Sequence, residues 1–398
     1  MLNLYSLCKS PLALLSAGFE DLRHPPAGNR PCLDMLRSLA VALVLSYHIR
    51  TFAPHAVRTL KMPFAQFGWT GVDLFFVLSG LLIGGQLWKE LRAKGTIDVR
   101  RFILRRGFRI WPFYYFLVAL LLAQQVLFGR NGRGLWLDAT FLSNYASWFK
   151  AGIHQVANGW SLSLEEQFYL LIPILLAICA KFLPSRFLVD LALIWLLALP
   201  LVRHFATAGL HDPGKIHAAI YYPFHTHSDG LAVGLLIAWI LTWKPEVLRM
   251  SRWLDAALVL VFLGSFCLWY VVSPIFLFSA VAISYGALTL FLLRMQQALF
   301  FGSRVFYVIS RLSYGVYLIH AGVIERVMTY HEHVFGEGFR SFVSAFILWG
   351  GVSLVLAFLT FSFIELPFLK LRDRLLAKNW LTDSSRDGTF TPSPSGAI

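Results

Sequence analysis

One apolar segment, near residues 33–53, contains an arginine and a histidine whose spacing fits a single helical face. Arg37 and His48 are eleven residues apart, which in an α-helix is about three turns and roughly 16 Å along the axis. Imidazole changes charge near neutral pH, so His48 is a candidate general base. Taken alone, His48 would be read as a hydrogen-bonded core histidine. Its alignment with Arg37 favours a functional site.

A carboxylate precedes this arginine in the same segment. Asp34 lies three residues before Arg37, a spacing at which the two side chains can pair on one helical face. The alternative interpretation is a purely structural ion pair at the inner end of the helix. We expect Asp34 either to brace the helix or to help Arg37 fix part of a substrate.

The densest basic run in the chain lies at residues 100–109. It contains five arginines in ten residues, of which Arg106 and Arg109 are three apart and share a face. A guanidinium group binds phosphate oxygens through two parallel hydrogen bonds, which lysine cannot do. The run therefore predicts a phosphate-binding site at Arg106 and Arg109. Binding of anionic lipid head groups is the alternative.

Three further positions have the right chemistry for a site. Asp73 is charged and lies early in an apolar segment, where Gly80 further along indicates close helix packing. Glu165 is favoured over its neighbour Glu166, because Glu166 has the spacing of a capping box with Ser163. Asp229 is interpreted as a polar packing or acceptor-binding residue.

Metal and disulfide sites are not expected. His225 and His227 alternate, and alternate side chains on a helix point in different directions, so a metal site there is disfavoured. The four cysteines are scattered without paired spacing.

These residues must be positioned within a membrane. Hydrophobic residues make up 57% of the 398, and charged residues 14%, which exceeds the apolar content of an ordinary soluble core. A membrane-spanning helix needs about 20 apolar residues, which leaves room for about ten. We therefore predict an all-α, polytopic membrane protein. Its expected helices lie near residues 33–53, 67–88, 109–129, 160–180, 187–203, 220–243, 253–272, 274–293, 306–328 and 342–368.

The basic residues predict the orientation. Most Lys and Arg fall on one side if both termini are cytoplasmic, so we attribute the net charge of +14 to topology and expect no nucleic-acid partner. Residues 1–30 are expected to form a cytoplasmic extension and residues 31–370 the integral domain. Residues 371–398 should form a cytoplasmic, largely disordered tail. The expected location is the inner (plasma) membrane.

Over residues 31–370 the sequence resembles membrane acyltransferase family 3, the integral-membrane O-acyltransferases of surface polysaccharides and related acceptors. One departure is that many members have an arginine just before the Asp229-Gly230 position, where this chain has only His225 and His227. The landmarks of the resemblance occur in order: Asp34, Arg37 and His48; residues 71–73 with Ser79 and Gly80; Arg106 and Arg109; residues 160–169; Asp229 and Gly230; residues 313–320; and Glu365 with Pro367.

The resemblance implies an acyl-CoA-dependent O-acyltransferase, with acetyl-CoA as the foremost donor and no metal. The acceptor would be a hydroxyl of a carbohydrate or similar molecule. The implied catalytic residues are His48, Arg37, Asp34 and Glu165, the donor-binding residues Arg106, Arg109, Ser313 and Tyr314, and the acceptor-binding residues Asp73, Asp229 and Trp160.

Three alternatives remain at this stage. An acyl-histidine intermediate on His48 would deliver the acyl group in two steps instead of one. A transporter or flippase of lipid-linked sugars would also need polar groups in the membrane, but gives no reason for arginines aligned with a lone histidine. A sensor or scaffold without catalysis would not require His48.

Overall fold

A computed structural model describes residues 10–26, 28–52, 67–129, 134–149, 156, 158–249, 252–268, 273–295, 303–335 and 339–384. Within these ranges the regular structure is helical and contains no strand, which confirms the all-α prediction. The helices are α1 (Pro11–Arg23), α2 (Pro31–Phe52), α5 (Gly71–Lys94), α6 (Val99–Phe128), α7 (Leu135–Ala139), α8 (Gly159–Cys179), α9 (Ser185–Thr207), α10 (Pro213–Tyr221), α11 (Asp229–Trp243), α12 (Arg252–Leu268), α13 (Pro274–Arg294), α14 (Ser303–Phe335), α15 (Phe339–Thr360) and α16 (Leu366–Ser384). Short 3-10 segments lie at Gly68–Thr70, Ser143–Tyr145 and Pro245–Arg249, and a π-helical turn at Phe361–Glu365.

Each of the ten expected segments contains a helix, but two details differ. The expected helix over 220–243 is interrupted between α10 and α11, where Pro223 lacks a backbone N–H for a continuous helix. Helix α16 extends to Ser384, so the first part of the expected disordered tail is helical, and residues 385–398 lie outside the described residues.

Six helical stretches of the described chain are long and apolar enough to cross a membrane. The expected number of about ten spans therefore stays a prediction. The six are Gly68–Lys94, Val99–Phe128, Gly159–Cys179, Phe187–Thr207, Pro274–Arg294 and Phe346–Leu376.

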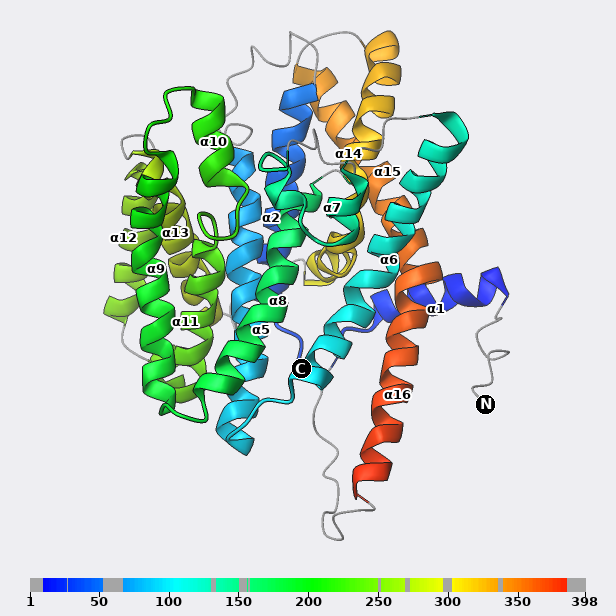
Figure 1. The fold of residues 1–398 in the computed structure, drawn as a ribbon. Helices are drawn as coiled ribbons and strands as arrows, with labels where there is room; N and C mark the ends of the chain where they lie inside the picture. Colours follow the sequence, from blue (N-terminus) through cyan, green and yellow to red (C-terminus); the bar gives the residue numbers. More distant parts are fainter. Residues whose placement is uncertain are drawn as a thin grey trace.

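Most of the long helices run side by side, whereas α1 lies across their direction (Figure 1). Helix α5 occupies the centre and packs against α2, α8, α11 and α13. Its apolar residues are buried on nearly all sides, as expected for a helix surrounded by other helices. On the other side of the molecule, α6 and α16 lie next to each other, and α14 packs against α2 and α15 (Figure 1).

Glycines allow α5 and α11 to approach closely. A methyl group added at Gly80 would lie 2.2 Å from the backbone oxygen of Leu231, and one added at Gly234 would lie 2.2 Å from the oxygen of Val77. Both distances are far below van der Waals contact. Small residues at a membrane helix interface let backbones pack this closely, and this is the role expected for Gly80.

A buried ion pair joins α9 to the start of α11. Arg203 donates to both carboxylate oxygens of Asp229, at 2.8 and 3.2 Å, and both side chains are fully buried. Arg203 also donates to Ser279 Oγ at 2.7 Å and to the carbonyl of Thr226 at 2.8 Å. The partner of Asp229 is therefore Arg203 on α9, which lies 26 residues earlier in the chain, and not a residue just before Asp229.

A second buried pair fixes the connection between α10 and α11. His227 Nε2 lies 2.9 Å from Asp73 Oδ1 of α5, and His227 Nδ1 lies 2.5 Å from the carbonyl oxygen of Tyr221. Neither Asp73 nor His227 is exposed. Asp73 therefore ties the non-helical turn before α11 to the central helix.

We predict that Gly80→Ala destabilises the folded protein by about 1–3 kcal/mol, because the added methyl forces α5 and α11 apart. Gly85 is the matched control, since a methyl there meets nothing within 4 Å. Thermal unfolding in detergent should show a lower midpoint for Gly80→Ala and an unchanged or higher midpoint for Gly85→Ala. Equal midpoints for the two variants would contradict this helix contact.

Breaking the ion pair between Arg203 and Asp229 should lower the free energy of unfolding more than Gly80→Ala does. Arg203→Leu leaves the Asp229 carboxylate buried without its cation, so we expect a loss of about 3–5 kcal/mol of stability. Changing both residues to leucine should recover much of this loss, because no buried charge remains. The measurement is the unfolding midpoint of the single and double variants in the same detergent. A double variant no more stable than Arg203→Leu would argue against the pair.

Candidate functional site

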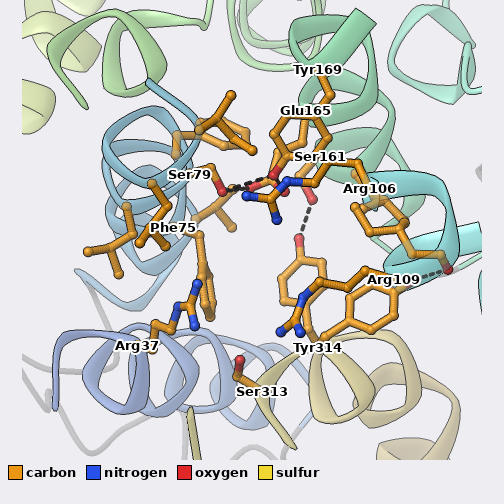
Figure 2. A pocket seen from close by; sticks show the side chains of 18 residues that line it. Arg37, Phe75, Ser79, Arg106, Arg109, Ser161, Glu165, Tyr169, Ser313 and Tyr314 are labelled. Atoms are coloured by element: carbon orange, nitrogen blue, oxygen red, sulfur yellow. Dashed lines mark hydrogen bonds between the residues drawn. The ribbon is translucent and has the colours of Figure 1, made fainter. Parts of the chain in front are cut away.

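A cavity of about 110 Å³ lies between α2, α5, α6, α8 and α14 (Figure 2). Eighteen residues line it, and the apolar ones come mainly from α5. The polar lining residues are Arg37, Ser79, Arg106, Arg109, Ser161, Glu165, Tyr169, Ser313, Tyr314 and Tyr317. The cavity therefore joins residues that are far apart in the sequence.

Three arginines dominate the electrostatics of this cavity. Arg37 comes from α2, and Arg106 and Arg109 come from α6, where their spacing places both on one face (Figure 2). Within the described part of the chain, no carboxylate oxygen lies within 4 Å of any of these three guanidinium groups. Arg106 lies over the ring of Tyr169, 5.5 Å from its centroid. Such a cluster of cations suits an anionic ligand.

Glu165 of α8 is the carboxylate among the lining residues. One of its oxygens accepts the hydroxyl of Ser79 at 2.8 Å and the other accepts the hydroxyl of Tyr169, also at 2.8 Å (Figure 2). The bond from Ser79 fixes the carboxylate against α5, and the bond from Tyr169 lies within α8. The single negative charge of Glu165 offsets only part of the charge of the three arginines.

The capping-box interpretation of Glu166 is wrong. Helix α8 already begins at Gly159, so Ser163 lies inside the helix and bonds Ser143 at 2.8 Å. Glu166 instead accepts the indole N–H of Trp111 on α6 at 3.0 Å.

Ser313 and Tyr314 of α14 also line the cavity, beside the arginines (Figure 2). The Ser313 hydroxyl donates to the backbone carbonyl of Ser310 at 2.7 Å. The Tyr314 hydroxyl donates to the carbonyl of Ile110 at 2.7 Å, one residue beyond Arg109. Tyr314 thus connects α14 to the part of α6 that presents the arginines.

Asp34 does not form the expected ion pair with Arg37. Its carboxylate is 6% exposed and accepts the side-chain N–H of Asn29 at 2.7 Å. Asn29 lies just before α2, so it reaches a carboxylate in the first turns of that helix. Arg37 is therefore turned toward the cavity, which Asp34 does not line.

His48 does not line the cavity itself. It faces His320 of α14, with ring centroids 4.8 Å apart and the rings nearly perpendicular. We call these two residues the histidine pair. Tyr317 connects the pair to the cavity, because it is a lining residue and its ring centroid lies 5.8 Å from that of His320. Tyr317 therefore lies between the cavity and His320.

The three expected acceptor-binding residues lie outside the cavity. Asp73 and Asp229 are fully buried in the pairs with His227 and Arg203 described above. Trp160 is 5% exposed and packs against Tyr221 and Tyr222, at centroid distances of 4.7 and 5.3 Å. In this arrangement all three support the helix contacts around α11.

Several cavity residues were not singled out from the sequence. Ser161, Tyr169 and Tyr317 contribute hydroxyl groups, and Phe75 packs edge-on against Tyr317 at 5.8 Å. His320, which does not line the cavity, lies in the recognised run 313–320 but was given no role, although an ionisable side chain in an apolar helix is costly without one. The hydroxyl-bearing residues carry no such signal.

Comparison with known proteins identifies the family of this chain. A family model described as an acyltransferase domain, that of acyltransferase family 3, matches residues 30–364. The chain is 30% identical over 242 residues to the peptidoglycan O-acetyltransferase OatA of Listeria monocytogenes, covering 56% of this chain and 36% of the relative. It is 27% identical over 379 residues to the O-acetyltransferase OatA of Staphylococcus aureus, covering 85% of this chain and 57% of the relative.

The chain thus spans about a third to just over half of the length of these curated relatives. No solved structure matches it. The family match covers most of the chain, including α2, α5, α6, α8 and α14, which line the cavity. This chain therefore belongs to acyltransferase family 3.

Proposed function

We propose that the protein is a membrane-embedded O-acetyltransferase that uses cytoplasmic acetyl-CoA. The acceptor is a hydroxyl group of a peptidoglycan-type glycan, a class supported by the name of the relative from Listeria monocytogenes. The protein lies in the plasma membrane with about ten spans and both termini in the cytoplasm.

The observation that carries this proposal is the cluster of Arg37, Arg106 and Arg109 at one cavity. Coenzyme A carries phosphate groups at one end and a thioester at the other. Guanidinium groups bind phosphate oxygens strongly, and no nearby carboxylate competes for these three among the residues that the structure describes. The phosphates would bind at the arginines while the thioester extends toward the histidine pair.

His48 would act as the base in the reaction. As the acceptor hydroxyl oxygen attacks the thioester carbonyl carbon, its proton passes to the imidazole. The carbon–sulfur bond then breaks, and the proton is returned to the departing thiolate, which gives free coenzyme A and the acetyl ester. An acyl-histidine intermediate uses the same residues in two steps.

We predict that Arg106→Gln and Arg109→Gln each raise the apparent KM for acetyl-CoA about tenfold or more. A hydrogen bond to a charged group contributes about 1.5–3 kcal/mol, and 1.4 kcal/mol corresponds to a factor of ten. Acetyl-pantetheine lacks the phosphates, so its kcat/KM should change little. The measurement is thiol release with each donor.

Arg100→Gln provides the matched control, because Arg100 lies in the same basic run, is exposed and does not line the cavity. Its KM for acetyl-CoA should equal that of the wild type. If both donors lost activity equally in Arg106→Gln, the phosphate-binding role would be refuted.

His48→Ala should lower kcat by at least about a hundredfold, because general base catalysis contributes about 10²–10⁴. The unfolding midpoint in detergent should remain close to that of the wild type. His204→Gln is the control, since this histidine is exposed at the end of α9. Full activity of His48→Ala in glycan acetylation would end the assignment of the base.

A further inference from the structure

The geometry around His48 assigns the proton on each ring of the histidine pair. His48 Nδ1 lies 2.9 Å from the carbonyl oxygen of Val44, and His320 Nδ1 lies 3.1 Å from that of Val316. A carbonyl oxygen only accepts hydrogen bonds, so Nδ1 carries the proton in both rings. In a neutral imidazole, Nε2 is then the nitrogen that can accept a proton.

Asn158 contacts the basic nitrogen of His320. Its side-chain Nδ2 lies 3.1 Å from His320 Nε2, and an amide nitrogen only donates. The basic nitrogen of His320 is therefore already used as an acceptor. The side chain of Asn158 is also in hydrogen-bonding range of His48. One amide thus holds both members of the pair.

The backbone fixes this amide in place. Asn158 caps the start of α8 with φ 59° and ψ 16°, a left-handed conformation that asparagine tolerates better than most residues. The Ser161 hydroxyl donates to the Asn158 carbonyl at 3.1 Å, and its oxygen accepts a hydrogen bond from Tyr317. Because Tyr317 lines the cavity, this chain of bonds connects Asn158 to the cavity wall.

The position of His320 is equally constrained. Its ring is fully buried, and the indole N–H of Trp349 on α15 donates to its backbone carbonyl at 2.8 Å. The ring centroids of His320 and Trp349 are 5.8 Å apart. His320 therefore has both ring nitrogens hydrogen-bonded and its backbone held by Trp349. Such a fixed ring can hold the neighbouring ring of His48 in place.

We propose that His320 and Asn158 are positioning residues for His48, so that the transfer centre consists of these three side chains. His320 packs against the face of the base, and Asn158 links the two rings to the start of α8. This inference rests on the proposed function, in which His48 accepts the proton of the acceptor hydroxyl.

The test compares His320→Ala, His320→Gln and Asn158→Gly with the wild type in full-length protein in detergent. Glycine adopts the left-handed conformation freely, so Asn158→Gly removes the amide while keeping the backbone. Glutamine at position 320 supplies an amide oxygen that can accept from Asn158. The assay follows thiol release from acetyl-CoA with a peptidoglycan-type acceptor, and His204→Gln serves as the control.

We expect kcat to fall about tenfold or more in His320→Ala and Asn158→Gly, because misplacing a catalytic group by about 1 Å can cost a hundredfold. The KM for acetyl-CoA should stay within about twofold of the wild type, since neither residue lines the cavity. His320→Gln should regain a clear part of kcat. A lower kcat at a nearly unchanged KM, together with the recovery of kcat in His320→Gln, would not follow from a general loss of structure.

A wild-type kcat in Asn158→Gly, or a kcat of His320→Gln no higher than that of His320→Ala, would overturn the positioning role. A rise in KM at unchanged kcat would overturn it as well. If His320→Ala does not fold, the kcat of Asn158→Gly alone tests the positioning role. Failure of the proposed function is distinguishable, because the wild type and His204→Gln would then release no thiol from acetyl-CoA.

Discussion

The organisation of this protein depends on the cost of placing positive charge among apolar helices. A charged side chain near the centre of a membrane costs about 2.5–3.5 kcal/mol on insertion scales, so its surroundings reveal its role. Arg203 is fully buried and donates to Asp229, Ser279 and two backbone carbonyls, which satisfies the guanidinium group completely. Arg37, Arg106 and Arg109 lie instead around a cavity. The first arrangement is structural, and the second requires water or an anionic ligand.

Helix α5 lies between the buried ion pair of Arg203 and the cavity that the other three arginines line. Its glycines let α11 approach closely, and on the same side Asp73 forms the pair with His227. Elsewhere on α5, Ser79 fixes Glu165 at the cavity wall. The helix therefore contributes both to the rigid packing around α11 and to the site. Rigid support of this kind holds the cavity residues in place before a ligand binds.

Residue spacing within a helix predicted one pair of the residues that line the cavity. It placed Arg106 and Arg109 on one face, and the structure brings both to the cavity with Arg37, together with Glu165 and two residues of α14. Contacts between distant helices could not be predicted in this way. A lone aspartate such as Asp229 looks the same in sequence whether it binds a ligand or an arginine from another helix. The pairing of Asp229 with Arg203 is visible only once α9 and α11 are packed together.

The same limit explains why the surroundings of His48 were missed. His320 was part of a recognised segment, but nothing in the sequence places it against α2, more than 270 residues earlier. Asn158 precedes α8 in a conformation that sequence spacing does not encode. Sequence reasoning therefore singled out His48 but not its contact with His320.

The rigid separation between Arg37 and His48 constrains the donor itself. Both residues lie on α2, so the roughly 16 Å between them cannot shorten unless the helix breaks. A donor with phosphates at one end and a thioester on a long arm can span this distance. The fixed length of one helix is thus compatible with the proposed donor, coenzyme A, whose phosphates and thioester lie far apart.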